Sequence, residues 1–455
     1  MKSLGKKAVS KMAWVLILAV VVVAAAGGYY YYQYIWLEQQ KPKEITVWWS
    51  WEVLPAEQVR KFEEQNNVKV HILVLGDELR DKLVSGFATG EVADVFAIDG
   101  CWVCEWVARG LLEPIPSDIA DEFTRTHNTA AFVNGAVKGT LYAVTFDISN
   151  HILMYNVKHF IDSGLDPNRP PETVEELREY AKKLARWDEK GNLMRAGFLI
   201  NRRDFYFGDL IHSHDGSLYN EDHNGDPRDG VFKATFNDAI GRRVIRNVVA
   251  MYLEDKTADY TWALPETFLA NKTSMMIVWG PGWILDILAL DQPLEVRFAP
   301  IPGETPHSGT GGMAYAVYKN SPNKDLAYKF LAWTVGKDAK KEYYLNVKKQ
   351  TALAEVSQTT LELQNDPDLF GDWPTEVKGA RIQPREEMQA ACSILDPPTG
   401  VPPWVRPKTI HYAEIHDNIW NPWMEKILLG QVSWEEGIEQ MVTEVNKVLE
   451  KGETP

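Results

Sequence analysis

Two-thirds along the chain, the sequence reads FAPIPG at residues 298–303, GTGGMAYAV at residues 309–317 and NSPNKDLAYKFL at residues 320–331. This order of apolar, glycine and proline positions predicts a strand, a loop, a Gly-Gly turn, a second strand, a proline turn and a helix. Another group can approach the backbone of Gly311 and Gly312 closely, because glycine has no Cβ. The segment therefore predicts part of a fold and a place where the chain can come near a ligand.

The N-terminal part of the folded chain alternates between the same kinds of element. Apolar, β-prone runs at residues 45–51, 68–75 and 94–99 predict three strands. Apolar residues at helical spacing within residues 58–64 and 77–88 predict a helix in each gap between these strands. Strands that alternate with helices favour a parallel sheet with helices on both faces, so we expect an α/β fold.

The composition limits the classes of function. With 455 residues, the chain is long enough for two or more units that each have a core. The formal net charge of −15 argues against nucleic acid as a partner, because phosphate binding needs a basic surface. The 17 Trp residues fit either core packing or stacking on the faces of a ligand. We expect an acidic monomer that binds no nucleic acid.

The N-terminus has the pattern of a membrane-crossing segment. Four lysines precede an apolar run over residues 12–28, and aromatic residues follow it up to Leu37. Together these runs exceed the roughly 20 residues that a bilayer needs. We expect residues 1–40 to form a basic cytoplasmic tip and a signal or transmembrane anchor, with the rest at the cell surface, on the extracellular or periplasmic side. Cleavage after Ala24-Ala25-Ala26 is the alternative to an uncleaved anchor.

The chain has three cysteines, and two of them, Cys101 and Cys104, have CxxC spacing. Outside the cell this spacing allows a local disulfide, and two buried thiols are the alternative. A zinc site would need two more ligands, and the chain has no second CxxC pair. We therefore expect no metal and no cofactor.

Six segments of the chain resemble motifs of one known family and occur in the same order. The chain closely resembles the extracellular solute-binding proteins that feed ABC importers, especially the sugar-binding group related to maltose-binding protein. The resemblance covers nearly all of residues 45–449. Its motifs are the first strand, helix and strand, GEVADV at 90–95, GTLYAV and ILMYN within 139–156, FLANKTSMM at 268–276, WGPGW at 279–283, and the segment quoted first.

The resemblance implies a periplasmic-binding-protein type II fold, in which two α/β lobes enclose a ligand cleft. The lobes are joined by crossing strands, and hinge bending closes them on the ligand. Transferred to this chain, lobe 1 takes residues 41–145 and 303–335, lobe 2 takes residues 150–297 and 340–455, and the hinge crossings fall near residues 146–149, 298–302 and 336–339.

Candidate ligand-binding residues follow from what a sugar presents. Its C–H faces suit aromatic planes, and its hydroxyl rim suits carboxylates. The sequence places such mixtures where predicted strands end, which is where open α/β sheets bind ligands. The family also places the Gly-Gly turn and the Trp-Gly-Pro turn at the cleft. The candidates are Trp49, Trp51, Glu52, Asp99, Trp102, Asp147, Trp279, Trp283, Gly311 and Gly312.

Structural explanations compete with these roles. Asp99 can cap the helix that begins near Trp102. Asp147, at the first crossing, can tie the lobes together instead of facing a ligand. Weaker candidates are Asp204, Phe205, Tyr206 and Trp404.

These features favour a binding protein over an enzyme. We expect the chain to capture a carbohydrate and present it to an ABC permease in the membrane. The alternative is a membrane-anchored extracellular glycoside hydrolase, because tryptophans and paired carboxylates also describe a hydrolase cleft. No catalytic motif is identified, and a metal or redox role for Cys101 and Cys104 lacks further ligands.

Overall fold

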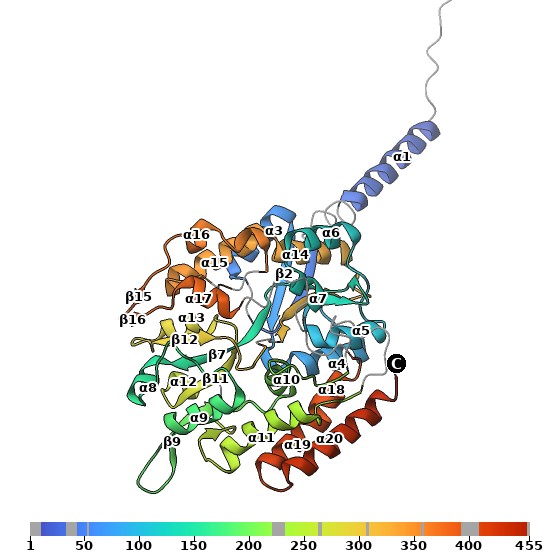
Figure 1. Ribbon diagram of the computed structural model, residues 1–455. Coiled ribbons are helices and arrows are strands. Elements are labelled where there is room, and N and C mark those ends of the chain that lie inside the picture. The colour runs from blue at the N-terminus through green and yellow to red at the C-terminus, as the bar shows by residue number, and fades with distance from the viewer. Residues whose placement is uncertain are drawn as a thin grey trace, which may run out of the picture.

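The computed structural model of the protein consists of two α/β lobes and one helix, α1 (Lys11–Tyr30), that extends away from them (Figure 1). This architecture agrees with the two-lobe fold expected from the sequence. The structure describes residues 11–32, 43–51, 54–220, 233–262, 266–305, 309–354, 356, 359–392 and 409–452.

Lobe 1 is built on a five-stranded sheet in the order β2-β1-β3-β14-β6. Strands β2 and β3 both lie parallel to β1, which confirms the parallel arrangement predicted for this part of the chain. Strand β14 comes from much later in the sequence and lies antiparallel to β3 and β6. The strands are β1 (Lys43–Trp49), β2 (Val68–Val74), β3 (Val95–Asp99), β6 (Val144–Thr145) and β14 (Met313–Val317).

In the core of lobe 1, these strands pack against helices from both the early and the late part of the lobe's sequence. The ring of Phe62 lies 5.1 Å from Phe330 and 5.0 Å from Trp333, so an early helix packs on a late one. The helices of this region are α3 (Ala56–Asn66), α4 (Leu79–Thr89), α5 (Val103–Ala108), α6 (Ser117–Thr126), α7 (Thr129–Gly135) and α14 (Lys324–Val335).

Lobe 2 is built on a second sheet, whose main path is β10-β9-β11-β7-β12. Along β7, Leu153 and Tyr155 enter one apolar core, and Ile152 and Met154 enter another. Side chains alternate across a strand, so this sheet has a core on each face. The strands are β7 (Ser149–Asn156), β9 (Leu193–Leu199), β10 (Ala258–Asp259), β11 (Thr273–Trp279) and β12 (Val296–Ala299), with β8 (Arg186–Trp187) and β13 (Thr310–Gly311) paired beside them.

Helices cover the lobe 2 sheet. Several of them begin with side-chain caps; for example, the hydroxyls of Thr173 and Ser433 accept hydrogen bonds from the amides of Glu176 and Glu436. The helices are α8 (Val157–Asp162), α9 (Val174–Leu184), α10 (Asp204–His212), α11 (Ala239–Leu253), α12 (Glu266–Leu269), α13 (Trp283–Ala289), α15 (Lys337–Thr351), α16 (Pro367–Phe370), α17 (Arg385–Ala391), α18 (Tyr412–Ile415), α19 (Asn421–Leu428) and α20 (Trp434–Leu449).

The chain passes between the sheets several times. It leaves the lobe 1 sheet after β6 and enters the lobe 2 sheet at β7. It returns between β12 and β14, and on the way β13 pairs with β7 through Thr310 and Asn150. At this return, the carbonyl of Gly312 accepts hydrogen bonds from the Asn134 side chain at 3.0 Å and from the Gly100 amide at 3.3 Å. The Gly-Gly segment therefore lies where the two lobes meet.

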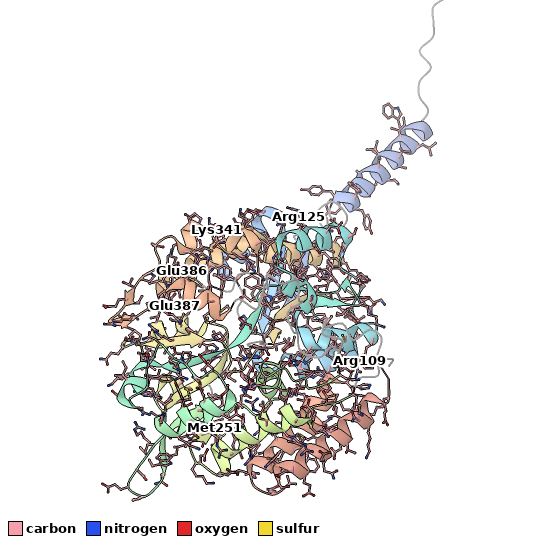
Figure 2. All side chains as sticks on the ribbon, in the orientation of Figure 1. Arg109, Arg125, Met251, Lys341, Glu386 and Glu387 are labelled. Atoms are coloured by element: carbon pink, nitrogen blue, oxygen red, sulfur yellow. The ribbon has the colours of Figure 1, made fainter. Side chains whose placement is uncertain are left out.

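Helix α1 extends its side chains away from the two lobes (Figure 2). Its exposed apolar side chains include Leu16, Val20 and Val23. Among the described residues, however, no helix has both the length and the apolarity that a membrane span requires. The transmembrane anchor expected over residues 1–40 is therefore not confirmed.

We predict that Gly312→Ala destabilises the protein. A Cβ at this position would lie 2.1 Å from the carbonyl oxygen of Asp147, so the crossing segment would have to move. Such overpacking should lower the free energy of unfolding by about 2 kcal/mol, measured by urea denaturation followed by tryptophan fluorescence. Gly336→Ala is the control, because its nearest neighbour would be 3.2 Å away and the loss should be smaller. Equal losses in the two variants would contradict this account.

Candidate functional site

A cavity of about 1160 Å³ lies between the two lobes. Lobe 1 contributes residues that follow β1, β2 and β3, and lobe 2 contributes residues from the ends of β11 and α10 and from the C-terminal helices. The crossing segments contribute the remainder. The polar side chains in its lining include six aspartates, at positions 77, 81, 99, 147, 286 and 417. The cavity therefore has the aromatic and acidic character expected for the cleft.

Eight of the ten predicted site residues line this cavity. They come from five separate parts of the sequence, and no two of these parts are neighbours along the chain. The structure brings them together, and their contacts with a ligand stay a prediction. The eight are Trp51, Asp99, Trp102, Asp147, Trp279, Trp283, Gly311 and Gly312.

Trp49 and Glu52 are the other two predicted residues. Trp49 is only 1 % exposed and lies in the core of lobe 1, where its ring stacks on Phe330 at 6.4 Å. It does not line the cavity, because it is still inside β1 and its side chain points into the packed face of the sheet. Glu52 lies outside the described residues, as does the weaker candidate Trp404.

The lobe 1 wall combines a cap with an aromatic surface. Asp99 caps the short helix η3 (Gly100–Trp102), since its side chain accepts a hydrogen bond from the Cys101 amide at 3.3 Å. The same residue lines the cavity, so the capping role and a ligand role are compatible. The guanidinium of Arg80 lies 4.9 Å from the ring centre of Trp102, which holds that ring at the cavity surface.

The cysteine pair corrects one expectation. Cys101 and Cys104 are buried thiols in the structure and do not form the disulfide considered from their spacing. The two positions are one helical turn apart in η3 and α5, where each packs as a small apolar side chain. Over the part of the chain that the structure describes, no cluster of three or more His, Cys, Asp or Glu residues is placed to hold a metal ion.

The lobe 2 wall centres on Trp279, the last residue of β11. Its ring lies 3.9 Å from the ring of His151 on the neighbouring strand and 5.2 Å from Phe205 on α10. Behind it, Nδ1 of His151 pairs with the buried carboxylate of Asp209, which also accepts a hydrogen bond from the Gly309 amide. These contacts fix the plane of Trp279 before any ligand arrives.

Residues missed from the sequence also line this wall. His416 and Asp417 reach the cavity from the C-terminal third of the chain, and Arg203 reaches it from the start of α10. They stand in none of the family motifs, and no local pattern singles them out. The weaker candidate Asp204 lies behind His416, which donates from Nδ1 to its carboxylate at 2.5 Å.

A second cavity of about 530 Å³ opens from the lobe 2 side of the cleft. Its lining includes the aromatic residues Tyr260 and Trp262, which do not line the first cavity. The two cavities share the lining residues Arg203, Trp279, Trp283, His416 and Asp417.

The crossing segment carries a buried charge network. The ammonium of Lys340 on α15 donates to the carbonyl of Phe146 at 2.5 Å and to the hydroxyl of Thr359. The hydroxyl of Tyr344 donates to Asp147 at 2.5 Å. Burial raises the pKa of Asp147, and the charge of Lys340 and the bond from Tyr344 oppose that rise. Burial lowers the pKa of Lys340 to about 8, against the attraction of Asp147.

Comparison with known proteins places most of the chain in one family. Residues 57–371 match the family described as bacterial extracellular solute-binding protein. The chain is 26% identical over 326 residues to a maltotriose-binding protein of Pyrococcus abyssi. That alignment covers 69% of this chain and 66% of the relative.

Solved structures share the fold. An ABC substrate-binding protein of Listeria monocytogenes, in complex with cycloalternan, superposes with a TM-score of 0.70 at 20% identity, over 90% of this chain and 99% of that one. The maltose/maltodextrin-binding domain of Bdellovibrio bacteriovorus, bound to maltotriose, superposes with a TM-score of 0.70 at 18% identity, over 90% and 100% of the two chains.

We predict that Lys340→Met changes the pH dependence of stability. Because the pKa of Lys340 is about 8 in the folded protein and ordinarily 10.5, the unfolded state binds more protons between these values. The free energy of unfolding of the wild type should therefore rise with pH there, by about 2 kcal/mol relative to Lys340→Met from about pH 7.5 to about pH 9.5. Urea denaturation at both pH values measures this difference.

Lys341→Met is the matched control for this measurement. Lys341, labelled in Figure 2, lies beside Lys340 in the sequence. Its ammonium pairs instead with Asp366 and Asp368. These bonds raise the pKa of Lys341, so its titration lies above the pH range used. Its stability difference from the wild type should stay constant. A constant difference for Lys340→Met as well would contradict the buried-charge account.

Proposed function

The chain belongs to the family of bacterial extracellular solute-binding proteins, and from this premise we propose that it captures a mono- or oligosaccharide between its two lobes. It then delivers that sugar to an ABC permease in a membrane. Membership of this family supports a location outside the cell or in the periplasm. It acts by binding and release, without catalysing a reaction.

The observation that supports a sugar most strongly is the pairing of aromatic rings with carboxylates across the cleft. Trp51 and Trp102 lie on the lobe 1 side, Trp279 and Trp283 on the lobe 2 side, and Asp99 beside them. Aromatic planes complement the C–H faces of a sugar ring, and carboxylates accept hydrogen bonds from its hydroxyls. The maltotriose-binding relative and the solved structures in complex with cycloalternan and maltotriose agree with this class of ligand.

Binding energy should come from several contacts together. One aromatic stack contributes about 1 kcal/mol beyond the area it buries, and micromolar affinity corresponds to about −8 kcal/mol. Ligand specificity should come from the carboxylates, because an unmatched polar group left buried in the closed cleft is costly. Glu52, which follows Trp51 directly in the sequence, is also a proposed ligand-binding residue.

The lobe boundaries stay those proposed from the sequence. Lobe 1 takes residues 41–145 and 303–335, and lobe 2 takes residues 150–297 and 340–455. The hinges are the crossings near residues 146–149, 298–302 and 336–339. The membership of β6 and β14 in one sheet and of β7 and β12 in the other supports this division.

The test is calorimetric titration with mono-, di- and trisaccharides of glucose, mannose, xylose and galactose. The wild type should bind at least one series, and Trp279→Ala and Trp283→Ala should each weaken that binding about tenfold. Trp187→Ala is the matched control, because Trp187 is exposed on β8 and does not line the cleft. Unchanged affinity in both cleft variants would remove the Trp-Gly-Pro turn from the site.

A reducing-sugar assay on the same mixtures tests the glycoside hydrolase alternative. Release of reducing ends at catalytic rates would overturn the binding-protein proposal. Stoichiometric binding without product supports it. The carboxylates of the cleft allow either result in principle, so the assay decides between two uses of the same residues.

We further infer that α1 holds the protein at a membrane. Its exposed apolar side chains support this inference. The observation against it is that no described helix has the length and apolarity of a membrane span. Expressed from the full sequence in a bacterial host, the protein should sediment with membranes and keep residues 1–40 in its intact mass. A soluble protein whose mass begins after Ala26 would show that the segment is a cleaved signal.

A further inference from the structure

We propose that His416 and Asp417 bind two hydroxyl groups on a second sugar unit, at the junction where the cleft continues into the lobe 2 cavity, with Asp204 as the positioning residue for His416. This inference rests on the proposed carbohydrate-binding function and names the ligand more narrowly. The ligand is then a neutral saccharide of at least two units.

His416 and Asp417 lie where the two cavities meet. His416 and Asp417 line both the 1160 Å³ cleft and the 530 Å³ side cavity, together with Trp279 and Trp283. A single sugar stacked on the tryptophans occupies the cleft. A second unit linked to it has room in the smaller cavity, whose lining includes Trp262.

Contacts with Asp204 and with two aromatic rings fix the orientation of the His416 side chain. Asp204 is fully buried, and its Oδ1 accepts hydrogen bonds from Nδ1 of His416 at 2.5 Å and from the hydroxyl of Tyr412 at 3.2 Å. The imidazole plane stacks between Tyr412 at 5.7 Å and Phe205 at 6.0 Å, within 15° of parallel to each. Ring plane and ring rotation are therefore both fixed.

The hydrogen bond between His416 and Asp204 also determines whether Nε2 of His416 is a donor or an acceptor. A carboxylate only accepts, so Nδ1 carries the proton that joins it to Asp204. In the neutral imidazole, Nε2 is then an acceptor. It lies 4.0 Å from Oδ1 of Asp417, whose side chain is 57% exposed. Two acceptors at this separation match two neighbouring hydroxyl donors on one sugar ring.

The local backbone supports a site here. Residues His416–Trp420 form a turn of π-helix between α18 and α19. Such turns interrupt regular helical hydrogen bonding and recur at functional sites. Here the irregular turn begins at His416, the residue that faces both cavities. The wider helical turn therefore coincides with the proposed contact.

The experiment compares sugars of different length on three variants. His416→Asn keeps a donor toward Asp204 and loses Nε2, and Asp417→Asn loses the charged acceptor. Each should weaken binding of the trisaccharide about tenfold and leave the monosaccharide within about twofold. The probes are the glucose, maltose and maltotriose series, or the corresponding series that the wild type binds. His71→Asn, at an exposed histidine outside both cavities, is the matched control.

Asp204→Asn tests the positioning role. Its amide can donate to Nδ1, which leaves Nε2 as a donor instead of an acceptor. The ratio of trisaccharide to monosaccharide affinity should fall about tenfold, as in His416→Asn. A purely structural role would instead lower both affinities together, in parallel with the thermal midpoint of unfolding.

Equal losses for short and long sugars in the His416 and Asp417 variants would overturn the proposal, and so would unchanged affinity for all lengths. Both results leave the carbohydrate-binding function intact. A wild-type protein that binds no sugar of any series overturns the proposed function itself, and this inference with it.

Discussion

The close packing of the crossing segments at Asp147 is the constraint on which the rest of the structure depends. Gly312 can lie against the Asp147 carbonyl only because it has no Cβ, and its own carbonyl binds Asn134 and Gly100 from lobe 1. The buried ammonium of Lys340 binds the carbonyl of the preceding residue from α15. Chain segments from three distant parts of the sequence thus meet at one point, and the cavity between the lobes opens directly above it.

The two walls of the cavity use different supports for the same kind of surface. On lobe 1, a cation beside Trp102 and a cap at Asp99 place the residues that follow β3. On lobe 2, two buried carboxylates five residues apart on α10, Asp204 and Asp209, hold His416 and His151 behind and beside Trp279. Preorganisation of this sort reduces the side-chain entropy lost when a ligand binds.

The sequence predicted ligand-binding residues where strand ends, glycine turns and tryptophans coincide with family motifs. It placed eight of ten residues at one cavity, and its error at Trp49 is instructive. Trp49 and Trp51 stand two positions apart in the same aromatic run, but β1 ends at Trp49. The ring of Trp49 therefore lies in the core, whereas Trp51 lines the cavity. The boundary of a strand is the least certain part of any pattern of apolar residues.

The order of strands and helices along the chain predicted an α/β fold, and the resemblance of six segments to motifs of the solute-binding family implied the two lobes. Local periodicity and turn chemistry depend on residues within a few positions of one another, so they can be recognised in the sequence alone. The partners of Asp147, Asp204 and Trp279 could not be inferred in this way. Tyr344, His416 and His151 lie 197, 212 and 128 positions from those residues. Only the packing of separate segments brings such groups within hydrogen-bond or ring-contact distance, because no local property of the chain encodes which distant side chain will share a buried site.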